Sequence, residues 1–200
     1  MPARDNASEP TECWSSIVGA THGPATLRDW IGREAGPIRA AGPIEWSDVR
    51  RFMNATGDTN PMWGDAPTAA NPHRDGALAP PAMLFDVLRP AAGEDDANEH
   101  GERPFPSIGG LAAAIEVPNE IGRMNAGTEV EWLRPLRIGD WLSVRFRIVD
   151  IQEKQTGSGP AVFITEERRY EDQAGAATAV VRQVTVRRLA APPARTGADA

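Results

Sequence analysis

The sequence predicts an α+β protein with one antiparallel sheet, in which helical segments precede the strands along the chain. The C-terminal third alternates apolar and polar residues with the period of two that is typical of half-buried strands. The middle of the chain places apolar residues at helical spacing. The 200 residues include 19 glycines and 18 prolines, which indicates a fold rich in turns.

Four strands are expected in the C-terminal part of the chain, over residues 128–133, 141–149, 161–170 and 178–188. The second of these has the clearest pattern, because Leu142, Val144 and Phe146 alternate with Ser143 and Arg145. Short connections between successive strands predict an antiparallel meander, with segment 134–140 re-entering the sheet. The apolar face of such a sheet must be covered by the segments upstream.

Two helices are expected to supply this cover. The first begins at Trp46, with Ser47 as its N-cap, and ends at Gly57. The second runs from Pro81 to Pro90, since proline suits the first turn of a helix and forbids its interior. Further helical pieces are expected at 11–18 and 26–33, and a charged surface loop at 93–106.

Length and composition favour one domain with loose ends. We expect a partly disordered N-terminal extension at 1–27, a domain at 28–188 and a disordered tail at 189–200. A net charge of −7, with no run of basic residues longer than two, argues against nucleic acid. No apolar run is long enough to span a membrane, and the single cysteine, Cys13, suits a cytoplasmic protein without disulfides.

The segment FMNATGDTNPMWGD holds the candidate chemistry. Asp58 and Asn60 follow the end of the first helix, where a carboxylate and an amide can converge on a pocket. The alternative is that both side chains only bond to nearby backbone, as Asp and Asn commonly do in turns. No spaced Cys/His set, P-loop or dinucleotide fingerprint is present, so we predict neither a metal nor a cofactor.

Three motifs, in this order, carry a resemblance to a known family. They are ATGDTNP, then APP before an amphipathic segment, then MNAGTEVEWLRPLRIGD. Over residues 28–188 the chain resembles the MaoC-like acyl-thioester dehydratases of the R-specific enoyl-CoA hydratase superfamily, and more closely their FAS1-like N-terminal dehydratase domain. The resemblance implies a single hot-dog fold, in which the sheet wraps a central helix, here placed at 81–90, with an N-terminal helical extension. It also implies reversible addition of water to an enoyl thioester of coenzyme A or acyl carrier protein.

The chain departs from the family pattern at one position. Members that catalyse alone carry GD-x-NP-x-H, but Trp63 stands where the histidine belongs. Indole cannot exchange a proton at neutral pH as imidazole does. The resemblance therefore implies a catalytic role only for Asp58, with Asn60 and Trp63 contacting substrate.

The thioester carbonyl is bound in this family by a backbone N–H at the start of the central helix. Pro80 and Pro81 have no N–H, so Ala82 and Met83 offer the first available donors. Both are predicted substrate-binding residues. The loss of two backbone donors agrees with a chain that forms only part of an active site.

These features predict a hydro-lyase subunit that forms the acyl-binding half of a heteromeric enoyl-CoA hydratase or 3-hydroxyacyl-thioester dehydratase of fatty acid or steroid metabolism. A second hot-dog subunit would supply the Asp/His dyad in a heterodimer or heterotetramer; otherwise a homodimer is expected. The alternatives are a non-catalytic acyl-thioester binding module, and a self-sufficient hydratase or thioesterase that uses Asp58 with water or His73.

Arginines recur on the predicted strands and are a further possible contact for coenzyme A phosphates. Arg168 and Arg187 are instead expected on exposed sheet faces, as solvated cross-strand partners of glutamates such as Glu166. We predict no coenzyme A contact for them.

Overall fold

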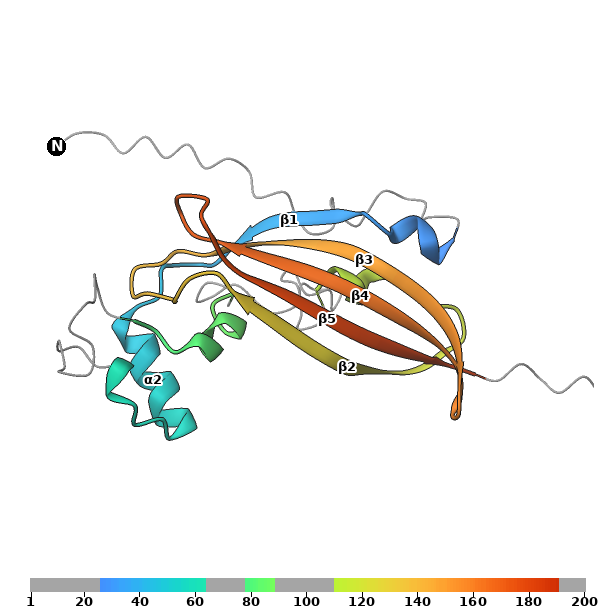
Figure 1. The fold of residues 1–200 in the computed structure, drawn as a ribbon, viewed down its shortest axis with the longest axis horizontal. Helices are drawn as coiled ribbons and strands as arrows, with labels where there is room; N and C mark the ends of the chain where they lie inside the picture. Colours follow the sequence, from blue (N-terminus) through green and yellow to red (C-terminus); the bar gives the residue numbers. More distant parts are fainter. Residues whose placement is uncertain (1–25, 64–77, 89–109, 191–200) are drawn as a thin grey trace, which may run out of the picture.

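The computed structural model describes residues 26–63, 78–88 and 110–190. Its main feature is a five-stranded antiparallel sheet (Figure 1). In the order in which they lie side by side, the strands are β1 (Glu34–Arg39), β3 (Ser143–Thr156), β4 (Gly159–Glu171), β5 (Ala177–Leu189) and β2 (Glu120–Trp132). The four strands expected from alternation are all present, and each is longer than predicted. β5 continues to Leu189, one residue into the predicted tail.

The predicted meander is correct for three strands and wrong for the fourth. β3, β4 and β5 follow one another as antiparallel neighbours, but β2 pairs with β5 instead of β3. Alternation specifies which face a residue occupies and says nothing about which strand lies beside it. Segment 134–140 does not re-enter the sheet; Leu136 accepts a hydrogen bond from Ala79, and Gly139 donates one to Ile44.

The N-terminal part of the described chain contains one strand that was not predicted. Within the helical piece expected at 26–33, a 3₁₀ helix, η1, spans Leu27–Trp30. The chain then enters β1, a strand that is absent from the sequence prediction and that contains Gly36 and Pro37. Proline is found in sheets at edge strands, and β1 lies at an edge.

The first predicted helix is confirmed as α2 (Trp46–Thr56). Gly57 ends it in the left-handed conformation, with φ of 69°, as expected for a glycine C-cap. The predicted N-cap is wrong, because Glu45 takes that position. Asp48 accepts a hydrogen bond from the Glu45 N–H at 3.1 Å and so completes a capping box.

The second predicted helix is much shorter than expected. It begins at Pro81 but is a 3₁₀ helix, η3 (Pro81–Phe85), and not an α-helix reaching Pro90. Met83 and Leu84 are buried, whereas Phe85 is 52% exposed. So short a segment has little helical stability of its own, and its packing therefore determines where it ends.

The hydrophobic core lies against one face of the sheet, and the short helices cover it. Val49 of α2, Leu84 of η3 and Leu111 of η4 (Leu111–Ala114) are buried there with strand residues such as Phe146 and Ile164. A last 3₁₀ helix, η2 (Pro61–Trp63), follows α2. The predicted α+β class is thereby confirmed.

Several predictions lie outside the described residues. These are the helical piece at 11–18, the loop at 93–106, Cys13 and His73. In the ranges that are described, no helix is long and apolar enough to cross a membrane. Within the same ranges, no group of three or more His, Cys, Asp or Glu residues is placed to hold a metal ion.

Candidate functional site

Asp58 lies at the C-terminal end of α2, directly after the Gly57 cap. Its backbone N–H donates to the carbonyl oxygen of Met53 at 3.1 Å, which fixes its position against the last helical turn. Its half-buried carboxylate is engaged through both oxygens. Oδ1 accepts the Asn60 N–H at 2.9 Å, and Oδ2 accepts the indole Nε1–H of Trp63 at 2.8 Å.

Asn60 has a matching local role. Its Oδ1 accepts the N–H of Met62 at 3.0 Å, and its backbone carbonyl accepts the N–H of Trp63 at 3.2 Å. These bonds wind the chain into η2 and bring the Trp63 indole to Asp58. The structure therefore collects Asp58, Asn60 and Trp63 into one turn, with the local bonding that the turn alternative predicts.

The Trp63 indole occupies the position of the family's histidine, but it cannot transfer protons as imidazole does. Trp63 Nε1–H is a donor only, so it can hold the Asp58 carboxylate in place but cannot accept a proton from water or deliver one to carbon. Any base at this turn must therefore be the Asp58 carboxylate itself, already receiving two hydrogen bonds.

Ala82 and Met83 lie on a separate element, η3. The Met83 N–H donates to the carbonyl of Pro80 at 3.0 Å and is used within the helix, and the side chain of Met83 is buried. Ala82 is exposed, and the second position of a 3₁₀ helix has no acceptor in the preceding turn. Of the two predicted donors, Ala82 is the one whose N–H is not used by the helix.

A second polar site lies inside the molecule. Glu166, Arg168 and Arg187 are 1%, 8% and 1% exposed, so the prediction that they are solvated surface residues is wrong. Arg168 Nε donates to Glu166 Oε1 at 2.7 Å, and Arg168 Nη2 donates to Gln183 Oε1 at 2.6 Å. All of these residues lie on the face of the sheet that carries the core.

This buried cluster forms hydrogen bonds to the first turn of η4. The Ala112 N–H donates to Glu166 Oε2 at 2.6 Å, while the Ala112 carbonyl accepts a hydrogen bond from Arg187 Nη2. Gly110 approaches so closely that a Cβ there would lie 2.2 Å from Glu166 Oε1. Arg187 also donates to Glu120 at 3.0 Å, so the cluster links β4, β5, β2 and η4.

Burial controls the titration of this cluster. It raises the pKa of Glu166 above its ordinary value, although Arg168 and the N–H of Ala112 oppose the shift. Burial likewise raises the pKa of Tyr170 and lowers the pKa of Arg187, the latter with the help of Arg123. Among the described residues, the buried Nε of Arg187 is left without a hydrogen-bond partner.

The sequence does contain a signal for the buried cluster, because alternate residues of β4 face the same side of the sheet. Alternation along this strand places Val162, Ile164 and Tyr170 on the core face, and Glu166 and Arg168 have the same parity. Polar residues in register with a core stripe are expected to be buried and paired.

Comparisons with known proteins agree with this fold. A family model for the FAS1-like dehydratase domain region matches residues 29–181. A Thermomonospora curvata protein named "Probable enoyl-CoA hydratase alpha subunit" is 32% identical over 162 residues, covering 78% of this chain and 49% of that protein. The chain thus spans about half the length of this relative.

Two solved structures from Mycobacterium tuberculosis show the same architecture. The ChsH1-ChsH2 complex matches with a TM-score of 0.64 and 22% identity, covering 78% of this chain and 89% of that chain. A protein with a double hotdog fold matches with a TM-score of 0.53 and 15% identity, covering 82% of this chain and 43% of that chain.

The sheet order and these matches define a hot-dog domain, which confirms the fold predicted from the motifs. The chain belongs to the FAS1-like dehydratase family.

Proposed function

We propose that this chain is the acyl-binding subunit of a heteromeric enoyl-thioester hydratase or dehydratase, and that a partner hot-dog subunit supplies the Asp/His dyad. One observation carries the proposal: the residue that holds the Asp58 carboxylate is the donor-only indole of Trp63. Addition of water to an enoyl thioester needs a base for the water and an acid for the α-carbon. A turn with one carboxylate and no imidazole is poorly equipped for both transfers.

The residues of this chain would act by binding and orientation. The Ala82 N–H is the donor available to polarise the thioester carbonyl, and such donors act by stabilising the charge that develops on oxygen. Asn60 and Trp63 would contact the acyl group beside Asp58, and Met83 would line its path. The substrate is an enoyl thioester of coenzyme A or acyl carrier protein, and no cofactor takes part.

Two comparisons support a second subunit. The Thermomonospora relative is named as an alpha subunit, and the ChsH1-ChsH2 structure is a complex of two proteins. The assembly would be a heterodimer or heterotetramer in the cytoplasm, with residues 28–188 of this chain forming its hot-dog domain.

The test is to purify this chain alone and together with a hot-dog protein that carries GD-x-NP-x-H, and to assay hydration of crotonyl-CoA and of longer or ring-bearing enoyl-CoA thioesters. We expect turnover only from the complex, and its loss when the aspartate of the partner's motif is changed to asparagine. Full activity of the isolated chain, abolished by Asp58→Asn, would instead establish a self-sufficient enzyme. Bound acyl-CoA without turnover in any pairing would establish a binding module.

A further inference from the structure

The connection between β2 and β3, residues 133–142, contains the sequence RPLRIGD. Its first residues are fixed to the sheet, because the backbone N–H groups of Leu133 and Arg134 donate to the carbonyl of Thr178 on β5, at 3.0 and 3.2 Å. From there the connection reaches the segments that lead into α2 and η3 (Figure 1). It therefore links the sheet to both elements that carry the candidate site residues.

Short backbone pairings join the connection to these two segments. The Ala79 N–H donates to the Leu136 carbonyl at 2.9 Å, three positions before Ala82. Ile44, two positions before α2 begins, donates to the Asp140 carbonyl at 2.9 Å and accepts the N–H of the preceding glycine at 2.8 Å. The placement of both elements thus depends on the shape of the connection.

The side chain of Arg134 fixes that shape. Its Nη1 donates to Asp140 Oδ2 at 2.9 Å, and its Nη2 donates to Asp172 Oδ2, in the turn between β4 and β5, at 2.9 Å. The same Asp140 oxygen accepts the Arg137 N–H at 2.8 Å, which closes the turn at 137–140. The three ionised side chains are 24%, 9% and 14% exposed, so solvent and salt screen these pairs less than fully exposed ones.

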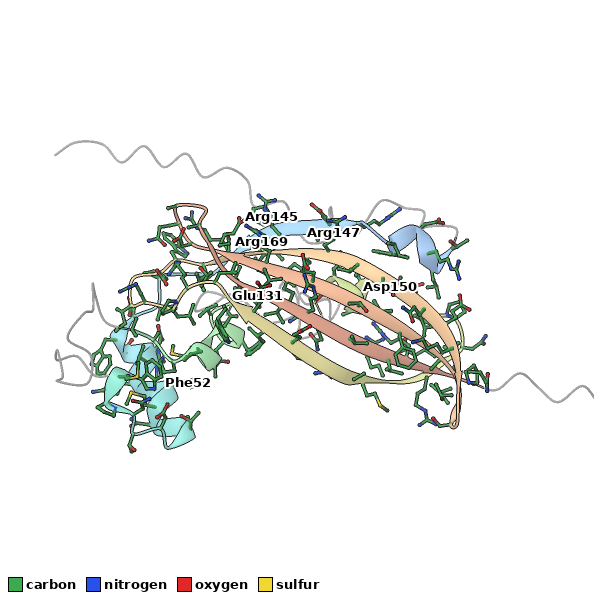
Figure 2. All side chains as sticks on the ribbon, viewed as in Figure 1. Phe52, Glu131, Arg145, Arg147, Asp150 and Arg169 are labelled. Carbon is green, nitrogen blue, oxygen red and sulfur yellow. The ribbon has the colours of Figure 1, made fainter. Side chains whose placement is uncertain are left out.

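These contacts lie at the end of the sheet that is nearer to α2. In Figure 2, Phe52 of α2 and Glu131, close to the end of β2, lie toward this end, whereas Asp150 of β3 lies further along the sheet. A planar guanidinium presents its N–H groups in fixed directions, so an arginine that meets two carboxylates restrains geometry more than a single point charge does.

We propose that Arg134 is a positioning residue of the hydratase site: by joining Asp140 to Asp172 it holds the Ala82 N–H and the Asp58 turn in a fixed relation to each other. The inference rests on the proposed function, to which it adds the residue that sets the geometry of this chain's half of the site. A donor for the thioester oxygen and a carboxylate beside the acyl group act together only when both are well placed. A misplacement of about 1 Å can cost on the order of 100-fold in rate.

The first measurement needs neither partner nor substrate. Amide hydrogen exchange of the isolated full-length chain is compared between wild type and Arg134→Ala, at Ala79 and Ile44 and, as an internal reference, along β4. We expect exchange at Ala79 and Ile44 to become about tenfold faster or more, because both amides donate to the connection that Arg134 holds. Exchange along β4 should change much less.

The second measurement uses the complex with the dyad-bearing hot-dog partner, and crotonyl-CoA as the probe. We expect Arg134→Ala to lower kcat about tenfold or more and to change KM less than about twofold, because well-placed groups act most strongly in the transition state. Guanidinium chloride at tens of millimolar, far below denaturing concentrations, should restore part of the lost kcat by binding between Asp140 and Asp172. Sodium chloride at the same concentration should restore none.

The matched control is Arg182→Ala, which removes an arginine that pairs with Glu167 at 2.9 Å on the exposed face of the sheet. This variant should leave kcat and the exchange at Ala79 and Ile44 unchanged. If Arg134→Ala is unfolded by circular dichroism, Asp172→Asn replaces it. This change removes an acceptor of Arg134 and keeps an oxygen for the N–H groups of the turn itself, so the same effects are expected at smaller size.

Unchanged exchange at Ala79 and Ile44, a loss of kcat that guanidinium does not restore, or an equal loss in Arg182→Ala would overturn the inference. Arg134 would then contribute to stability alone. Failure of the proposed function is distinguishable, because the wild-type complex itself would be inactive, and the role of Arg134 in catalysis would fall with it.

Discussion

Asp58 and Glu166 are carboxylates held by hydrogen bonds of similar length but opposite origin. Asp58 receives its side-chain bonds from Asn60 and Trp63, two and five positions along the chain. Glu166 receives one from Ala112, 54 positions away, and another from Arg168 on its own strand. Asp58 is half-buried at a helix end, whereas Glu166 is almost wholly removed from solvent.

Asp58 is therefore held by hydrogen bonds within one turn, whereas Glu166 is held by tertiary contacts. The side-chain bonds of Asp58 join residues at most five positions apart in the chain. Those of Glu166 exist only after β4 has met η4, and they are made where desolvation makes an unpaired partner costly. We therefore expect stability to depend steeply on Glu166 and weakly on Asp58.

The largest effect should come from Glu166→Ala. This change leaves the buried Arg168 without its Nε acceptor and removes the acceptor of Ala112. Removing one member of a buried ion pair costs roughly 3 to 5 kcal/mol. The free energy of unfolding, measured by urea titration, should fall by that amount.

The control for this variant is Glu167→Ala, one residue further along β4. Glu167 pairs with Arg182 on the exposed face, with the two side chains 27% and 49% accessible. Such a pair is worth about 0 to 1 kcal/mol. If Glu166→Ala and Glu167→Ala lowered the free energy of unfolding equally, the tertiary contacts of Glu166 would not be important for stability.

A smaller effect is expected from two glycines of positive φ, one near each carboxylate. Gly110 has φ of 55°, and a Cβ added there would lie 2.2 Å from Glu166 Oε1, whereas Gly57 has φ of 69° and open space around it. Gly57→Ala should cost about 1 kcal/mol from backbone strain alone. Gly110→Ala adds a steric clash and should cost about 2 to 4 kcal/mol in the free energy of unfolding.

A double variant sharpens this second comparison. In Gly110→Ala/Glu166→Ala the clash partner is gone, so the combined loss of stability should be smaller than the sum of the two single losses. Thermal and urea denaturation both report the coupling. Strict additivity would show that Gly110 is required only for its backbone conformation.

Much of the local structure could be predicted from the sequence. The four long strands follow from alternation, and α2 with its Gly57 cap follows from spacing and composition. The turn at Asp58 is similarly local, so its residues could be grouped before the structure was known. What these features share is that their determinants lie within a few residues.

The features that the sequence did not predict depend on distant segments. β1 is a strand because β3 offers it an edge, despite Pro37. η3 stops at Phe85 although Val87 and Leu88 beyond it pack against the core, and β2 joins β5 across the sheet. The hydrogen bond between Glu166 and Ala112 joins residues 54 positions apart, so no local sequence pattern predicts it.

The stability of the protein should also depend on pH through Glu166. Burial raises the pKa of Glu166 in the folded protein above the ordinary value of 4.5, so the folded state binds the proton more tightly than the unfolded state. Its contribution to stability is therefore complete below pH 4.5 and declines as the pH rises through the folded pKa, with a slope of at most about 1.4 kcal/mol per pH unit.

Glu166→Gln isolates this contribution, since glutamine keeps the shape without titrating. The advantage of wild type over the variant in unfolding free energy, measured by urea titration at a series of pH values, should shrink as the pH rises above 4.5. An advantage that grows with pH would mean that the bonds from Arg168 and Ala112 outweigh burial.

A small effect on stability is expected from the Asp58 turn. Trp63→Phe removes the indole donor at 2.8 Å from Asp58 Oδ2 and keeps most of the ring packing, so it should cost about 1 kcal/mol. A double-mutant cycle with Asp58→Ala measures the coupling directly, and the matching cycle of Glu166→Ala with Arg168→Ala should give a larger value. If the Asp58 coupling equalled that of Glu166, Trp63 would be holding the carboxylate against a strain that local turn chemistry does not produce. Asp58 would then be better explained as a residue positioned for substrate than as a turn former.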